Sequence, residues 1–287
     1  MSIVVTAATG HLGTLVVDEL LQRVPADQVV AVARNAAKAA PLAERGVEVR
    51  IADYNDPAAL AKAFGAGDTV LLISGLEPNR LEQHKAVLAA AQDAGVARIA
   101  YTSVLGGPEA DFDLAADHRA TEQAILDSGL PYTILRNGWY NEVYTDQLAV
   151  QLANGVVGSA GDGLIASAAR RDYAAAAAVV LTSEGHEKKA YELNGDVAWT
   201  LTEYAAELAK QSGMDIGYTN LSPEDHAQVL VGAGLPEPVA QLFVGVDNAI
   251  ERGLLAGRGS DLTRLIGRPT TPVAESISAA LKTVQAG

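Results

Sequence analysis

The sequence predicts an α/β fold built on a doubly wound parallel sheet, and two observations carry that prediction. Short β-branched segments alternate with longer segments of helical periodicity through the first 136 residues, an order typical of right-handed β-α-β units. The strand candidates are almost continuously apolar, as in VLLIS at 70–74. This composition favours strands that helices cover on both faces.

The individual elements follow from the same alternation. Strands are expected where apolar and β-branched residues cluster, at residues 3–6, 29–33, 47–51, 69–73, 98–102 and 132–135. Helices are expected between them, at residues 11–23, 35–45, 79–94 and 114–128. A further helix should begin at Pro57, because proline suits the first helical position and Asp56 can cap that helix.

After Arg136 the alternation ends, and the remaining sequence predicts a smaller C-terminal α/β lobe. Helices are expected at residues 170–181, 202–212, 222–233 and 236–252, with a late strand at 191–193. We therefore divide the chain into residues 1–136 and a substrate-binding lobe at residues 137–287. No clean linker separates them, so the lobe is treated as integral with the first part.

The composition disfavours several classes of protein. The formal net charge of −14 argues against nucleic-acid binding, because an acidic surface repels phosphate. The absence of cysteine rules out disulfides and thiolate chemistry, and the five histidines lack metal-ligand spacing, so no metal is expected. Neither a signal peptide nor a membrane span is apparent, which favours a cytoplasmic protein.

The segment TAATGHLG at residues 6–13 follows the first strand and opens the first helix. This is the context of a dinucleotide fingerprint. Gly10 can let the backbone approach a pyrophosphate, and Gly13 can let the helix pack closely on the strand. Ala7 occupies the position of the first glycine, where a positive φ would cost roughly 1 kcal/mol and a negative φ would not. We therefore expect a Rossmann-type dinucleotide site in residues 1–136.

The end of the second strand indicates which dinucleotide is bound. An NAD-binding unit carries Asp or Glu there to hold the ribose hydroxyls, but this chain carries Arg34. A guanidinium can pair with a 2′-phosphate, and no carboxylate competes at that position, so NADPH is the expected cofactor. The alternative is a solvated surface arginine. Asp53 and Tyr54, after the third strand, are candidates for the adenine side.

Blocks of sequence along nearly the whole chain point to one family. They are TAATGHLG, QVVAVARN, ADYND, VLLISG, GVARIAYTS, YTILRNGWYNE, GHEKKAYEL and LIGRPTTPVAE. In these blocks the chain resembles the NmrA-like branch of the atypical short-chain dehydrogenases/reductases. Within that branch it is most similar to the bacterial flavin-free NAD(P)H:quinone oxidoreductases, and the triphenylmethane reductases are close.

The resemblance implies a set of cofactor contacts. The pyrophosphate would be wrapped by Ala7, Ala8, Thr9, Gly10, His11 and Leu12, with Gly13 completing the motif. Arg34 would contact the 2′-phosphate. The ribose and pyrophosphate would pass beside Ser74, Gly75 and Leu76. The nicotinamide side, within residues 137–142, would be formed by Asn137, Gly138, Trp139 and Tyr140. Relatives usually carry glycine where this chain has Ala7.

The catalytic pattern of the classical short-chain dehydrogenases is only partly present. Those enzymes use a serine on the fifth strand and a Tyr-x-x-x-Lys pair on the next helix, whose tyrosine protonates an alkoxide. This chain has Ser103, but His118 stands where the tyrosine would fall and Glu122 where the lysine would fall. Reduction of a carbonyl to an alcohol is therefore disfavoured. A quinone gives a hydroquinone anion, a far weaker base, so positioning can supply most of the catalysis.

Several residues have two open interpretations. His118 could donate a proton near neutral pH, or be a solvated helix histidine. Three aromatic side chains could offer faces to a planar substrate or pack the lobe, namely Trp139, Tyr140 and Tyr144. One of Arg170 and Arg171 could touch the cofactor, or both could begin a solvated helix.

Three functions fit these features. The first is an NADPH-dependent oxidoreductase that transfers hydride to a quinone or similar planar acceptor, with Ser103, His118 and Tyr140 as candidate catalytic residues. The second is an NADP(H)-binding redox sensor without turnover. The third is a reductase of triphenylmethane dyes or imines. The expected partner is a small molecule, and the expected assembly is a monomer or homodimer.

Overall fold

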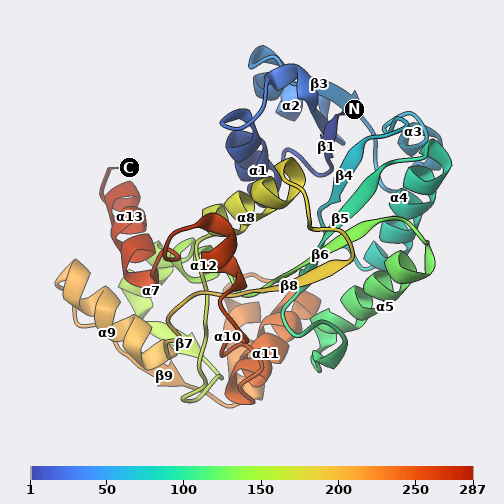
Figure 1. Cartoon of the computed structure of the whole chain (residues 1–287). Coiled ribbons are helices and arrows are strands. Elements are labelled where there is room, and N and C mark those ends of the chain that lie inside the picture. Colours follow the sequence, from blue (N-terminus) through green and yellow to red (C-terminus); the bar gives the residue numbers. More distant parts are fainter. Residues whose placement is uncertain (1, 287) are drawn as a thin grey trace.

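The computed structural model describes residues 2–286 (Figure 1). Seven parallel strands form one sheet in the order β3-β2-β1-β4-β5-β6-β8. They are β1 (Ile3–Val5), β2 (Val29–Ala33), β3 (Glu48–Ile51), β4 (Thr69–Leu72), β5 (Arg98–Val104), β6 (Tyr132–Asn137) and β8 (Lys189–Leu193). The doubly wound α/β prediction is confirmed, and each strand ends within two residues of its expected bounds.

Helices cover both faces of this sheet. One face carries α1 (His11–Leu21), α2 (Ala36–Glu44) and α8 (Arg170–Thr182). The other carries α3 (Pro57–Leu60), α4 (Arg80–Ala94) and α5 (Asp113–Asp127). Side chains alternate along a strand, so neighbouring residues point to opposite faces of the sheet. Val5 packs with α1, while Val4 packs with α4. The expected cap is confirmed, since the Asp56 carboxylate accepts the first free N–H groups of α3.

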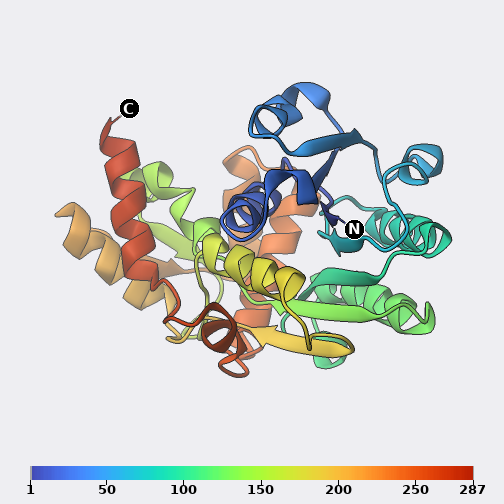
Figure 2. The ribbon, with the colours of Figure 1, turned by 45° about the horizontal axis from the view of Figure 1, so that its top comes forward.

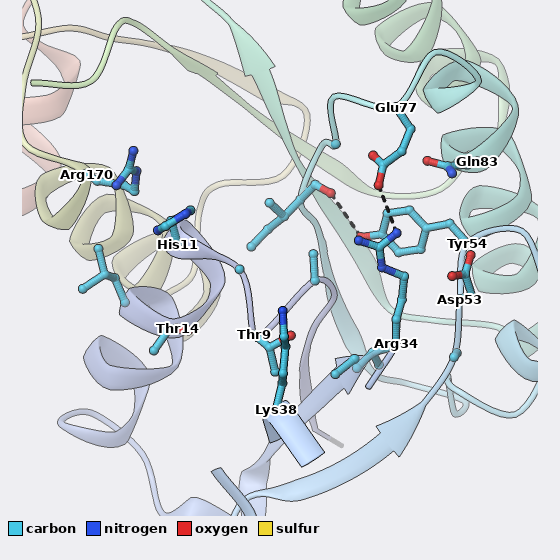
Figure 3. A pocket seen from close by; sticks show the side chains of 18 residues that line it. Thr9, His11, Thr14, Arg34, Lys38, Asp53, Tyr54, Glu77, Gln83 and Arg170 are labelled. Atoms are coloured by element: carbon cyan, nitrogen blue, oxygen red, sulfur yellow. Dashed lines mark hydrogen bonds and ion pairs between the residues drawn. The ribbon is translucent and has the colours of Figure 1, made fainter. Parts of the chain in front are cut away.

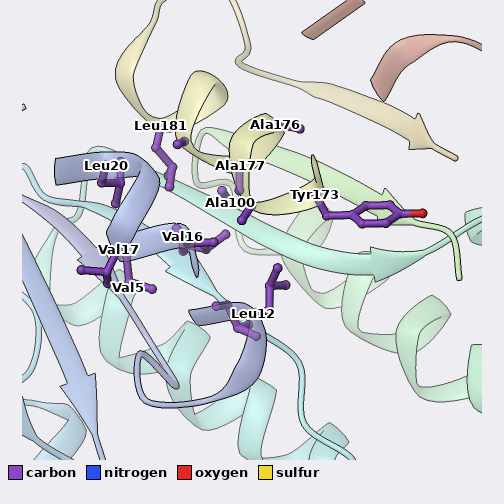
Figure 4. Close-up of a cluster of buried hydrophobic side chains, with 14 of the residues drawn as sticks. Val5, Leu12, Val16, Val17, Leu20, Ala100, Tyr173, Ala176, Ala177 and Leu181 are labelled. Carbon is purple, nitrogen blue, oxygen red and sulfur yellow. The ribbon is translucent and has the colours of Figure 1, made fainter. Parts of the chain in front are cut away.

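The packing of α8 on α1 fixes the first layer. Val16 and Leu20 of α1 share a buried cluster with Ala177 and Leu181 of α8 (Figure 4). Five consecutive alanines in α8, at residues 174–178, leave room for the two helices to approach closely. Close packing against α8 therefore fixes the position of α1, whose first turn belongs to the expected dinucleotide site.

The lobe lies to one side of the sheet (Figure 2) and has its own core around Trp199, Tyr204 and Leu208. A small parallel sheet pairs β7 (Val156–Gly158) with β9 (Tyr218–Asn220). The helices are α6 (Glu142–Thr145), α7 (Leu148–Asn154), α9 (Leu201–Ser212), α10 (Pro223–Gly232), α11 (Glu237–Glu251), α12 (Asp261–Ile266) and α13 (Val273–Ala286). Two short 3₁₀ turns, Ala26–Gln28 and Gly107–Glu109, complete the elements.

The chain passes more than once between the sheet and the lobe. It leaves the sheet after β6, builds α6, α7 and β7, and then returns to place α8 and β8 against β6. The sheet and the lobe are therefore interleaved along the chain. The division into two parts at residue 136 remains a prediction. Among residues 2–286, no helix is long and apolar enough to cross a membrane.

The order of the strands creates a crevice. Strand β1 lies between β2 and β4, so the winding of the chain reverses there. Connections leave on opposite faces at such a point, and ligands of open α/β sheets bind in the gap at the carboxyl ends of the strands. The loops after β1, β2, β3 and β4 all face this gap.

Candidate cofactor-binding site

The loop between β1 and α1 is unusually tight. Ala7 has a φ of +48°, so the strained alternative considered for this position is the one observed, at a cost of roughly 1 kcal/mol. The N–H of Gly10 donates to the carbonyl of Ala7 at 2.9 Å. A Cβ at Gly13 would stand 2.3 Å from that same carbonyl oxygen. Only glycine allows α1 to begin this close to the loop, as expected for Gly13.

The N-terminus of α1 faces the crevice and is open to an anion. Gly10 caps the helix without a side-chain hydrogen bond, and no acidic residue stands in the first turn of this described helix. The free N–H groups and the helix dipole at such an end favour a negative group. The first turn of α1 therefore suits a phosphate.

A cavity of about 800 Å³ opens in front of this helix (Figure 3). Its volume is within the range of small-molecule and cofactor sites. It is lined by Ala7, Thr9, Gly10, His11, Thr14, Leu15, Val32, Ala33, Arg34, Lys38, Ala52, Asp53, Tyr54, Ile73, Gly75, Glu77, Gln83 and Arg170. The structure thus brings residues of the glycine loop together with Arg34, Gly75, Asp53 and Tyr54, which the sequence had also singled out.

Other residues of the expected set do not line the cavity. Ala8 is fully buried and donates its N–H to the Val32 carbonyl, and Leu12 is buried under the loop. Ser74 is fixed at the end of β4, where Thr102 Oγ1 accepts its N–H at 2.9 Å. Leu76 points outward, with 72% of its surface exposed.

Tyr54 forms part of the cavity wall and is held firmly. Its hydroxyl lies within hydrogen-bond distance of Thr6 Oγ1 and the Ile73 carbonyl. Burial raises the pKa of the Tyr54 phenol, so the ring stays neutral. The segment after β3 thereby offers a fixed aromatic edge to the cavity.

The Arg34 guanidinium is paired across the cavity. Its Nη1 lies 3.0 Å from Oε1 of Glu77, on the loop after β4 (Figure 3). No carboxylate stands at the end of β2 itself, but one reaches Arg34 from the loop after β4, which the sequence did not indicate. Lys38, one helical turn further along the chain, also lines this end of the cavity.

Arg170 lines the cavity, and behind it Tyr140 connects Arg170 to Asn137, although Asn137, Gly138 and Tyr140 do not line the cavity themselves. Asn137 Nδ2 donates to the Tyr140 hydroxyl at 3.1 Å, and the Arg170 guanidinium lies 5.2 Å from the centre of the Tyr140 ring. Within residues 2–286, the buried Oδ1 of Asn137 has no hydrogen-bond partner. Gly138 is needed for packing, since a Cβ there would stand 2.9 Å from the Leu193 carbonyl oxygen.

The two arginines that begin α8 point differently. Arg170 lines the cavity, and its N–H is accepted by the Glu142 carboxylate. Arg171 instead pairs with Glu275 and bonds to Thr271. Of the two candidates, Arg170 is the one that faces the cavity.

Two of the expected aromatic residues pack the lobe. Trp139 and Tyr144 contact the lobe core, and the Tyr144 ring stacks edge-on with Trp199 at 5.1 Å. Both line a separate cavity of about 90 Å³ together with His226 and Asp247. For these two residues the packing alternative is the one the structure shows, and Trp139 is not at the larger cavity.

The positions that replace the classical catalytic residues form buried structural contacts. His118 is buried, and its Nδ1 lies 2.8 Å from the Tyr101 hydroxyl. Burial lowers the pKa of its imidazole from 6.5 to about 3. Neither expectation for His118 is met, since it is not solvated and does not line the cavity.

Ser103 and Glu122 belong to a second buried network. The Ser103 hydroxyl donates to Glu122 Oε1 at 2.5 Å, and Glu122 pairs with Arg136 at 2.8 Å. Arg136 in turn pairs with Glu192 of β8 at 2.9 Å. This network ties α5 to β6 and β8, and Ser103 does not line the larger cavity.

Sequence reasoning missed Lys38, Glu77 and Gln83. Lys38 lies in the first turn of the helix that follows Arg34 directly, and this place in the sequence could have indicated it. Glu77 lies in an irregular loop without periodicity, and nothing in the sequence signals where its side chain points. No group of three or more potential metal ligands occurs in the described part of the chain.

Comparisons with known proteins bear on the whole chain. Residues 7–184 match a family described as NAD(P)H-binding. Quinone oxidoreductase 2 of Escherichia coli is 50% identical over 278 residues, which cover 96% of this chain and 97% of that protein. A crystal structure of an NADPH-dependent quinone oxidoreductase from Escherichia coli, complexed with NADPH, is 49% identical with a TM-score of 0.94 and covers 97% of this chain and 99% of its own. The triphenylmethane reductase of Citrobacter sp., complexed with NADP(H), is 42% identical with a TM-score of 0.93, covering 97% and 100%.

Proposed function

The chain belongs to the NAD(P)H-binding, NmrA-like family, and we propose that it is an NADPH-dependent oxidoreductase that transfers hydride to a quinone. One observation carries the proposal, namely 50% identity to a quinone oxidoreductase across nearly the full length of both chains. An identity that extends through the lobe supports a shared acceptor as well as a shared cofactor.

The cavity fits the cofactor in three respects. Its volume of about 800 Å³ accommodates a dinucleotide. The uncapped start of α1 suits the pyrophosphate, and Arg34 with Lys38 suits the 2′-phosphate. Behind the cavity-lining Arg170, Tyr140 contacts Asn137, whose buried Oδ1 lacks a partner and would be satisfied by a carboxamide N–H.

Bound NADPH would supply the hydride, and the chain would supply binding and orientation. Arg34 and Lys38 would hold one end of the dinucleotide, while Arg170, supported by Tyr140 and Asn137, would border the other. A general acid matters less for a quinone than for a ketone, because the hydroquinone anion is a weak base. The buried contacts of His118 and Ser103 are compatible with such an acceptor.

The direct test is oxidation of NADPH by the purified protein with a panel of benzoquinones and naphthoquinones, followed at the nicotinamide absorbance band. Turnover with at least one small quinone is expected. Bound NADPH without turnover across the panel would refute the oxidoreductase and favour the redox sensor. A large affinity difference between NADP⁺ and NADPH would then support the sensor.

A second candidate activity has its own support. The 42% identity to the Citrobacter triphenylmethane reductase favours cationic dyes as alternative planar acceptors. Decolourisation of such a dye in the presence of NADPH, measured beside the quinone panel, would rank the two acceptors by kcat/KM. We further propose a cytoplasmic monomer or homodimer, which light scattering and cell fractionation would test.

A further inference from the structure

We propose that Glu77 is a specificity-determining residue for the cofactor, because its carboxylate competes with the 2′-phosphate of NADPH for Arg34. The proposal rests on the proposed function, in which NADPH occupies the large cavity. Its consequence is a weaker preference for NADPH over NADH than Arg34 and Lys38 alone would give.

The competing contact is direct. Arg34 follows β2, Glu77 lies on the loop after β4, and Nη1 and Oε1 are 3.0 Å apart (Figure 3). The other carboxylate oxygen lies over Gly75, where an added Cβ would stand 2.3 Å from Oε2. One oxygen of the Glu77 carboxylate therefore contacts the Arg34 guanidinium, and the other lies over the Gly75 backbone at the edge of the cavity.

The backbone of Glu77 has little freedom to leave this place. Its carbonyl accepts the N–H of Arg80 at 3.0 Å. The next part of the loop is tied to the segment after β3, since Asn79 Nδ2 donates to Asn55 Oδ1 at 2.8 Å. A ligand that enters the cavity can rotate the Glu77 side chain. Because the Glu77 backbone is fixed, the carboxylate stays close to Arg34.

Of the two carboxylates that line the cavity, Glu77 is the one that pairs with Arg34. The other carboxylate at the cavity, Asp53, already accepts the N–H and the side-chain amide of Asn55 at 2.8 and 3.0 Å. A 2′-phosphate carries close to two negative charges. To bind Arg34 it must displace the Glu77 carboxylate, and the negative charge of Glu77 then repels the phosphate. The 2′-hydroxyl of NADH is instead a donor that a carboxylate can accept, as Asp or Glu does in NAD-binding units.

The size of the effect follows from the exposure of the pair. The side chains of Arg34 and Glu77 are 64% and 37% exposed, so water and salt screen their charges. Exposed pairs of this kind contribute modestly. We expect Glu77 to change the ratio of the two cofactor affinities by roughly three- to tenfold at low ionic strength.

The test is the variant Glu77→Gln, which keeps the side-chain shape and removes the charge. Dissociation constants for NADPH and NADH are measured by cofactor fluorescence, at roughly 20 mM and roughly 500 mM salt. NADPH should bind roughly three- to tenfold more tightly at low salt while NADH binds equally or more weakly, and the gain should shrink at high salt.

Glu82→Gln is the matched control. Glu82 lies on α4, 72% exposed and paired with Lys85, so the variant makes the same change in net charge away from the cavity. It should leave the affinity ratio within roughly twofold of the wild type. An unchanged ratio in Glu77→Gln would overturn the proposal. Weaker NADPH binding would also overturn it, because Glu77 would then be helping Arg34 rather than competing for it.

The binding measurements separate this inference from the proposed function. If NADPH binds but no quinone is reduced, the oxidoreductase fails, while the two affinity ratios still decide the role of Glu77. If quinone is reduced and the ratios do not move, only the role of Glu77 fails. If the wild-type protein binds neither cofactor, both proposals fall.

Discussion

The hydroxyl of Tyr101 lies 2.8 Å from Nδ1 of His118, and both side chains are buried where α4 and α5 cover β5. His84 packs edge-on against the same tyrosine ring at 5.4 Å. Burial lowers the pKa of His118 to about 3 and that of His84 to about 4. Two neutral imidazoles in one core make the fold sensitive to acid.

The first prediction concerns this sensitivity. An unfolded histidine takes up a proton below about pH 6.5 and the buried one does not, so stability is complete above that pH and falls as the pH drops toward the folded pKa. Each of the two histidines should cost about 1.5 kcal/mol between pH 6.5 and 5.0. Urea unfolding at both pH values would measure the loss. His118→Gln should show a smaller loss, whereas a variant of exposed His11 should match the wild type.

The second prediction concerns the strained loop. Ala7→Gly should remove the cost of the positive φ of +48° and stabilise the protein by up to about 1 kcal/mol. Ala8→Gly is the matched change at the adjacent residue, which lacks a positive φ and is fully buried. It should destabilise the fold by roughly 1 kcal/mol. If both substitutions changed the free energy of unfolding equally in thermal unfolding, the positive φ of Ala7 would not be a source of strain.

The third prediction concerns the basic end of the cavity. Arg34→Ala should weaken NADPH binding roughly tenfold or more and NADH binding much less, because the charge-assisted contact to the 2′-phosphate is lost. Lys38→Ala should have a smaller effect of the same sign. Arg45→Ala removes an arginine that pairs with Asp18 instead and serves as the control. An unchanged cofactor preference in Arg34→Ala would disprove the phosphate assignment.

The fourth prediction separates structural from chemical roles. Glu122→Gln weakens the pairing of Arg136 inside the sheet layer and should cost roughly 3 kcal/mol. Ser103→Ala removes one hydrogen bond and should cost about 1 kcal/mol. Because Ser103 does not line the cavity, Ser103→Ala should keep kcat and KM near wild-type values. A large loss of kcat in a variant that still folds would show that Ser103 takes part in catalysis.

The sheet could be predicted because its strands are continuous apolar runs separated by helices of regular period. The pair β7 and β9 could not, since β7 lies in a glycine-rich segment and β9 reads Tyr-Thr-Asn, without an apolar run. The loop at 6–13 and Arg34 were found because strand, glycine and helix follow one another in the sequence. Glu77 and the burial of His118 were not, because both depend on which distant segments meet: an irregular loop opposite β2, and α4 beside α5.

The return of the chain to the sheet has a consequence for its synthesis. The helix that covers α1 begins at Arg170, and the seventh strand ends at Leu193. A nascent chain of 136 residues therefore still exposes Val16 and Leu20, which α8 later buries. Such a fragment should aggregate rather than bind a nucleotide on its own. The cofactor site therefore matures only after two thirds of the protein has left the ribosome.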